Sequence, residues 1–141
     1  MRDFIHLHVH TYYSLLDGQS PINQLVEKAV KDGMKGMAIT DHGNMFGIKE
    51  FFDCCQKLNK SRKKEGKEPF KPIFGCEMYV ADGKMTDHSS KKDTGRHLVV
   101  LAKNQNGYHN LIKLVSNAWT DGYYYRPRTD KSQLEKYHED L

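Results

Sequence analysis

Short β-prone runs alternate with stretches of helical periodicity along most of this chain, and this order leaves few possible folds. Each β-prone run is either apolar or alternates apolar with polar residues, as strands do. The expected strands are residues 4–9, 36–40, 72–80 and 97–102. Together with the helices, they predict an α/β fold with a mostly parallel sheet, either open or closed into a barrel.

Three helices are expected between and after these strands. The first has Ser20 as its N-cap and Pro21 at its first helical position, and it ends at Gly33. The second contains residues 48–55 and the third contains residues 108–119, because apolar residues recur three and four positions apart in both. Each apolar stripe needs a sheet to cover.

The rest of the chain is expected to form loops and one more short helix. Residues 81–95 show no apolar period, so the strand at 97–102 is expected to return antiparallel to the strand at 72–80. Residues 123–128 are expected to form a loop, and a capping box at Ser132–Glu135 predicts a last helix.

The composition favours a single domain without a membrane span. A chain of 141 residues with 38% hydrophobic content can bury one modest core. No stretch approaches the roughly 18 apolar residues of a membrane span, and no signal peptide is visible, so a cytoplasmic location is expected. Three cysteines, two of them adjacent, do not suggest a disulfide framework. The net charge of +4 is modest, and the lysines and arginine that crowd residues 57–71 are expected to form a solvated helix end and loop rather than a nucleic-acid patch.

Histidines occupy one face of the first expected strand. His8 and His10 are two residues apart, so their Cα atoms lie about 7 Å apart on the same face and both side chains can reach a metal. Imidazole suits zinc, iron or manganese. His6 shares the face but lies nearer the start of the strand, whereas sites in α/β folds form at the carboxyl ends. We therefore favour His8 and His10 as metal ligands.

Further candidates follow from the ends of the other expected strands. His42 is an expected ligand after the second strand, and the adjacent Asp41 is the candidate catalytic residue, expected to orient a neighbouring imidazole. Glu77 lies in an apolar run, where a carboxylate is costly unless it is paired or binds a metal. His97 should lie near Glu77 if the last two strands are antiparallel, and Asp17 could add an oxygen ligand from a loop.

Each of these features has a simpler explanation when it is taken alone. A His-x-His in a strand or an Asp-His at a strand end is usually accidental, and Glu77 could pair with a lysine or arginine. The combination is harder to dismiss, because four separate elements each place a histidine or a carboxylate toward one pocket. Structural or surface roles are expected for a second group of residues, namely His88, His109, His138, Cys54, Cys55 and Tyr123 to Tyr125.

These residues resemble the PHP (polymerase and histidinol phosphatase) family, whose first motif is His-x-His followed by Thr or Ser, here His8-Val9-His10-Thr11. Nearly the whole chain is similar to the start of bacterial DNA polymerase III alpha subunits of the DnaE type, more than to PHP phosphatases. The strings that carry this similarity are residues 6–18, 38–47, 72–80, 98–104 and 107–111.

The resemblance implies a distorted barrel of about seven strands that holds up to three divalent ions, zinc or manganese, for phosphoester hydrolysis. The family's ligands fall on six positions, namely His8, His10, Asp17, His42, Glu77 and His97. Its later ligands would lie beyond Leu141, so residues 1–141 are expected to be the N-terminal portion of a single PHP domain. A truncated barrel would leave an open sheet edge able to pair with another copy.

The function implied is that of a replicative DNA polymerase, a nucleotidyltransferase whose partners are DNA and the rest of the replicase, with a metal-dependent 3′–5′ exonuclease site for proofreading. The fragment alone is not expected to extend a primer or to bind a membrane. One alternative is a metal-stabilised interaction module without activity. Another is a phosphatase of small molecules such as histidinol phosphate, which would not explain the strings around Asp17, Asn44 and Tyr108.

Overall fold

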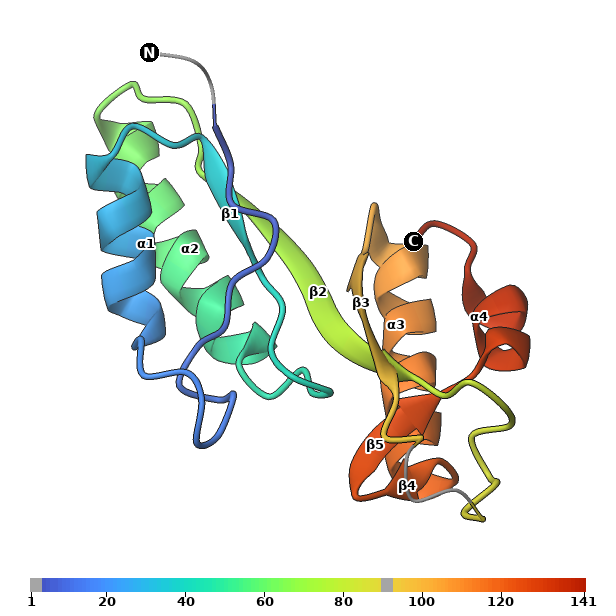
Figure 1. Ribbon diagram of the computed structural model, residues 1–141. Coiled ribbons are helices and arrows are strands. Elements are labelled where there is room, and N and C mark those ends of the chain that lie inside the picture. Colours follow the sequence, from blue (N-terminus) through green and yellow to red (C-terminus); the bar gives the residue numbers. More distant parts are fainter. Residues whose placement is uncertain (1–3, 90–92) are drawn as a thin grey trace.

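A long strand, β2, runs through the middle of the molecule, as Figure 1 shows for a computed structural model that describes residues 4–89 and 93–141. One group of elements (α1, α2 and β1) lies at one end of β2, and the remaining elements lie at the other end. The bounds in chain order are α1 Ile22–Lys31, β1 Gly36–Ile39, α2 Ile48–Lys64, β2 Lys71–Val80, β3 Arg96–Leu101, α3 Gln105–Thr120, β4 Tyr123–Tyr124, β5 Arg126–Thr129 and α4 Lys131–Tyr137.

The strands confirm a mixed α/β fold organised around β2. The first residues of β2 pair in parallel with β1, and residues 75–80 pair antiparallel with β3, as the absence of a connecting helix predicts. The last two residues of β2 pair in parallel with β5, which in turn pairs with β4. Because residues 79–80 pair with both β3 and β5, these two strands occupy opposite edges of β2.

Two apolar cores lie along β2, one at each end. The first forms where α1 and α2 cover β1, around fully buried Ile22 and Phe51. The second forms where α3 covers β2 and β3, around Leu111 and Leu114. Burying each such side chain contributes about 1.5–3 kcal/mol before entropy costs, which explains why the helical periodicity predicts these three helices well.

The expected strand at residues 4–9 does not form. This segment runs beside β1, where His6 O accepts from Ala38 N (2.8 Å) and Val9 O accepts from Thr40 N (2.8 Å). The acceptors are three residues apart but the donors only two, so the regular ladder is broken in the manner of a bulge. The segment is still held close to β1, because Val9 N also donates to Thr40 Oγ1 at 2.9 Å.

Two helix starts and one loop also differ from expectation. Pro21, rather than Ser20, is the N-cap of α1, and it has no side-chain cap hydrogen bond. Asp130, rather than Ser132, caps α4, because its carboxylate accepts from Gln133 N at 3.0 Å and from Ser132 Oγ at 2.7 Å. The expected loop at 123–128 instead contains β4 and the start of β5.

Residues 81–89 and 93–95 lack helix and strand, as expected, and positions 90–92 of that loop lie outside the described residues. Arg128 of β5 holds the loop in place, since its guanidinium donates to the carbonyl oxygens of Met85, Asp87 and Asp93 at 2.9 Å each. Among the described residues, no helix is both long and apolar enough to span a membrane.

Candidate metal centre

Glu77 of β2 lies at the centre of a cluster of histidines, and the residue is only 1% exposed. Its Oε2 contacts Nε2 of His8 and lies 2.6 Å from Nε2 of His10. Its Oε1 contacts Nδ1 of His97 and lies 3.5 Å from Nδ1 of His42. One buried carboxylate is thus surrounded by four imidazoles.

The backbone brings these side chains together from four separate segments. His42 follows β1 and forms a parallel bridge with Glu77. His97 of β3 lies opposite Tyr79, two residues beyond Glu77, so it projects from the same face of the sheet. The extended segment beside β1 carries His8 and His10 to the same place.

The loop from Thr11 to Gly18 adds a second carboxylate. Asp17 Oδ2 lies 2.8 Å from His42 Nε2 and 3.2 Å from His10 Nδ1, and these hydrogen bonds lower the pKa of Asp17. The loop turns tightly, since a Cβ at Gly18 would lie 2.0 Å from the carbonyl oxygen of Thr11. Only glycine permits this approach, which brings Asp17 to the histidines.

Among the described residues, the Asp41 carboxylate has Thr11 and Ser14 as its hydrogen-bond partners and no imidazole, which differs from the role expected for it. Its buried carboxylate accepts from the backbone N–H of Thr11 (2.7 Å), from Thr11 Oγ1 (2.9 Å) and from Ser14 Oγ (2.6 Å). Each of these donors belongs to the loop that follows His10 and leads to Asp17. Asp41 therefore anchors that loop to the end of β1.

The donor atoms fall into three overlapping groups, in each of which the atoms lie within 4.8 Å of one another. The groups are His8, His10 and Glu77; His10, Asp17 and His42; and His42, Glu77 and His97. His42 Nδ1 is buried and has no hydrogen-bond partner among the described residues, as expected of a nitrogen meant for a metal. Imidazole nitrogens and carboxylate oxygens fit zinc or manganese.

The charge state of Glu77 also suits a cation. Burial by itself raises the pKa of this carboxyl, but hydrogen bonds with His8 and His10 and the charges of His42 and His97 outweigh it, so the pKa lies below its ordinary value. Glu77 is therefore ionised at neutral pH. In contrast, burial raises the pKa of the adjacent Cys76, which stays a neutral thiol.

Arg126 at the start of β5 is a site residue that the sequence did not reveal. Its guanidinium lies 3.5 Å from Nε2 of His97 and 4.8 Å above the ring of Tyr79. The sequence offers no signal for this position, because the residue reaches the cluster only through the pairing of β5 with β2, which are distant in the chain.

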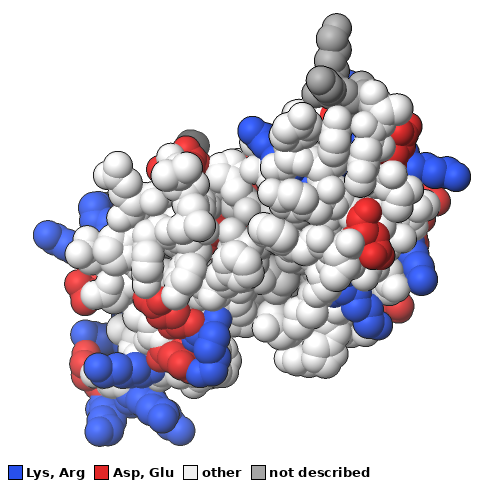
Figure 2. Space-filling model, turned by 90° about the horizontal axis from the view of Figure 1, so that it is seen from below, with Lys and Arg blue, Asp and Glu red and all other residues white. Residues whose placement is uncertain are grey.

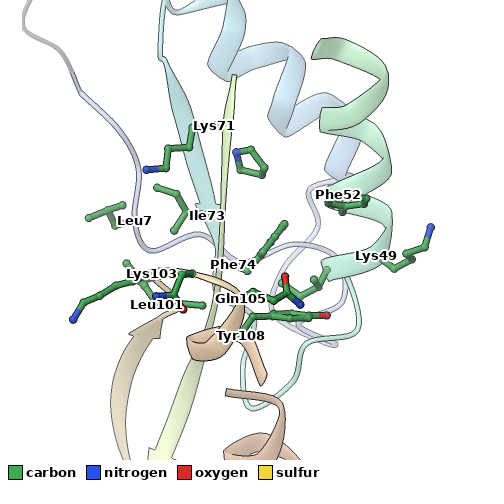
Figure 3. A pocket seen from close by; sticks show the side chains of 14 residues that line it. Leu7, Lys49, Phe52, Lys71, Ile73, Phe74, Leu101, Lys103, Gln105 and Tyr108 are labelled. Carbon is green, nitrogen blue, oxygen red and sulfur yellow. The ribbon is translucent and has the colours of Figure 1, made fainter. Parts of the chain in front are cut away.

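A large pocket among the described residues lies away from this cluster. It measures about 770 Å³ and is lined mainly by apolar side chains from α2, from the start of β2 and from the start of α3, including Phe52, Phe74 and Tyr108 (Figure 3). None of the six candidate ligands lines it. Cavity volume therefore does not identify the position of the candidate metal site in this molecule.

The fold and the cluster agree with the family comparison, in which residues 6–141 match the PHP domain, and the chain belongs to this family. It is similar to proteins named DNA polymerase III subunit alpha, as the sequence strings predict. The relative from Borreliella burgdorferi is 49% identical over 98% of this chain and 11% of the relative. The relative from Treponema pallidum is 45% identical over 98% of this chain and 11% of the relative. The relative from Aquifex aeolicus is 42% identical over 99% of this chain and 12% of the relative.

The chain therefore spans about a tenth of the length of these relatives. Among solved structures, a proposed metal-dependent phosphoesterase from Bifidobacterium adolescentis is 23% identical, with 81% of this chain and 32% of that chain covered. The TM-score of 0.45 means that the two structures are only loosely alike.

Proposed function

We propose that this chain carries the metal-dependent phosphoesterase site of a bacterial DNA polymerase III alpha subunit, and that the site removes nucleotides from the 3′ end of DNA. The observation that carries the proposal is the buried carboxylate of Glu77 within contact of four histidines. Primer extension, contacts with other replicase subunits and a cytoplasmic location are proposed only for the longer protein, because the chain spans 11% of its Borreliella relative.

Up to three divalent ions, zinc or manganese, would be held by the three overlapping groups, with Glu77, His10 and His42 each shared by two of them. When bound, such ions polarise a phosphoester and supply an activated water. The chain's own contribution is to fix the ligands on rigid backbone and to keep Glu77 and Asp17 ionised. Asp41 acts as a positioning residue for the loop that carries Asp17, in place of the catalytic role expected for it.

We further propose that the described strands form part of a distorted barrel of the PHP type, with residues 1–141 as one portion of a single domain. The parallel pairing of β1 with β2 and of β2 with β5 supports this arrangement. β4 ends the described sheet, so its outer edge could pair with a second copy of the chain.

A structural role without catalysis is the second candidate function. The segment that carries His8 and His10 has two backbone hydrogen bonds to the β1 region, so bound metal would tie this segment to β2. A phosphatase of small molecules such as histidinol phosphate is less well supported, since the similar proteins are named as polymerase subunits.

The decisive experiment measures four quantities: metal content by elemental analysis, thermal stability with and without metal, nucleotide release from a 3′-labelled DNA strand, and turnover of histidinol phosphate. Wild type is compared with a His8→Ala/His10→Ala variant, and a His109→Ala/His138→Ala variant serves as the control because these histidines lie outside the three donor groups. Metal and turnover that are both lost only in the first variant support the exonuclease. Metal-dependent stability without turnover supports the structural role, turnover of histidinol phosphate alone supports the phosphatase, and a metal-free wild type contradicts all three.

A further inference from the structure

Three exposed aromatic rings lie in a row on the surface, and we call Phe46, Trp119 and Tyr123 the aromatic strip. Their exposures are 60%, 42% and 51%, respectively. The ring centroids of Phe46 and Trp119 lie 6.2 Å apart, and those of Trp119 and Tyr123 lie 5.5 Å apart with an angle of 22° between the planes. Trp119 and Tyr123 are stacked, whereas Phe46 is tilted by 38° from Trp119. A hollow of about 390 Å³ opens beside Phe46 and Trp119.

The aromatic strip is attached to the backbone that carries a candidate metal ligand. Trp119 Nε1 donates to the carbonyl oxygen of Gly43 at 2.8 Å, and Gly43 directly follows His42. Gly43 has φ +59°, and a Cβ there would lie 2.7 Å from Cγ of Pro127. Both constraints require glycine at this position. The strip is thereby held at a fixed place next to the metal cluster.

The second feature beside the cluster is a cation, Arg126. Arg126 is exposed, and within residues 4–89 and 93–141 no carboxylate pairs with it. Its position above the Tyr79 ring and beside His97 fixes the guanidinium at the rim of the cluster. A guanidinium in such a place is complementary to a phosphate group.

From these features we infer that the aromatic strip and Arg126 bind single-stranded DNA at its 3′ end, with bases stacked on the rings and a backbone phosphate at the guanidinium. Every base has a face that stacks on aromatic side chains, so such binding does not depend on sequence. The inference rests on the proposed function, since it names the substrate-binding surface of the same site.

Charged side chains are unevenly distributed over the surface of the molecule. Figure 2 views the molecule from below, toward the end where β4 and β5 lie in Figure 1. Lys, Arg, Asp and Glu side chains gather around the margin of this face and are sparse in its middle. Few cations are therefore available on this face for phosphate groups, so the DNA binding that we infer depends on stacking and on the contact at Arg126.

Trp119 is the only tryptophan of the chain, so its fluorescence reports directly on stacking at the aromatic strip. The purified chain is titrated with a short oligodeoxythymidine strand whose phosphorothioate linkages resist hydrolysis. We expect quenching of Trp119 fluorescence. Tyr123→Leu should weaken binding about tenfold or more, whereas Tyr123→Phe keeps the ring and should bind like wild type.

Two further variants complete the test. Arg126→Ala should weaken binding. It should also reduce the slope of log affinity against log salt concentration by about one, because one fewer counterion is released from the DNA. Phe52→Leu removes an exposed ring from α2 that lines the large pocket instead, and it should bind like wild type. A strand with abasic sugars should not quench Trp119, because it offers no base to stack.

Several results would overturn the inference. One is the absence of quenching by DNA, and another is equal binding by Tyr123→Leu and wild type. A third is quenching that depends on protein concentration alone, because this would mean that a second copy of the chain covers the aromatic strip. Because binding is measured without hydrolysis, DNA that binds but is never cleaved contradicts only the proposed exonuclease. Cleavage that survives in Tyr123→Leu and Arg126→Ala at unchanged KM contradicts only this inference.

Discussion

His42 and Glu77 lie opposite each other in a parallel β-bridge that extends the pairing of β1 with β2 beyond the end of β1. Gly43 N donates to Glu77 O at 2.8 Å, and Glu77 N donates to Asp41 O at 3.0 Å. Two candidate ligands from different strands are thus held at the spacing of neighbouring strands, about 4.8 Å. The backbone, rather than a flexible side chain, sets the centre of the metal cluster.

Replacing Glu77 by glutamine should weaken metal binding strongly while preserving the shape of the side chain. The variant Glu77→Gln removes the negative charge that four imidazoles surround, and an amide is a poor ligand for zinc or manganese. We expect metal affinity to fall by at least about 10–100-fold, the loss seen when only an indirect partner of a ligand is removed. Titration with a metal indicator measures this change. Glu65→Gln, at an exposed carboxylate outside the cluster, is the control, and an unchanged affinity in Glu77→Gln would rule out the site.

Asp41 should affect stability more than chemistry. Asp41→Asn places an amide donor against the donors of Thr11 and Ser14, which should cost about 1–3 kcal/mol in the free energy of unfolding. Ser14→Ala removes one donor and should cost about 0.5–1.5 kcal/mol. Urea denaturation measures both changes. An Asp41→Asn chain that is as stable as wild type but inactive with saturating metal would point to a catalytic carboxylate instead.

A lysine cannot replace Arg128. The side chain is fully buried, and its two terminal nitrogens serve three carbonyl oxygens of the loop before β3. Because lysine has one nitrogen in place of the planar fork, Arg128→Lys should lower the free energy of unfolding by roughly 1.5–3 kcal/mol. Hydrogen exchange at residues 82–89 should also accelerate. Arg96→Lys, at an exposed ion pair with Asp82, should change neither quantity, and equal behaviour of the two variants would contradict this role.

The cap of α4 predicts a loss of stability in acid. Burial by itself raises the pKa of Asp130, but hydrogen bonds from Met85 N, Ser132 and Gln133 N outweigh it, so the folded pKa lies below the ordinary value. Asp130 therefore stabilises the fold above the unfolded pKa of about 3.9, and this stabilisation disappears as the pH falls through the folded pKa.

Asp130→Ala should cost about 0.5–2 kcal/mol at neutral pH, and the difference from wild type should shrink below about pH 4. Chemical denaturation of both chains across this pH range tests the sign. A difference that stays constant or grows in acid would show that the carboxylate does not act in its ionised form.

The sequence by itself determined the α/β class, the three longer helices and the antiparallel return of β3. These features depend on local periodicity, and apolar faces that recur with the helical or strand period have to be buried. The candidate ligands could be proposed in the same way, because His8, His42 and Glu77 stand out chemically next to expected strands. The structure brings these residues together with His10, Asp17 and His97.

Only the tertiary structure decided where Asp41, Arg126 and the residues around Tyr123 lie and what they contact. Asp41 is distinguished from a metal ligand by its hydrogen-bond partners, Thr11 and Ser14. These partners precede it by about thirty residues, so the local sequence around Asp41 does not reveal them. Arg126 and Tyr123 lie in a segment without strand periodicity that becomes β4 and β5 because β5 pairs with β2, far away in the chain. Such pairing depends on which distant backbone groups meet, and local sequence patterns do not predict these long-range contacts.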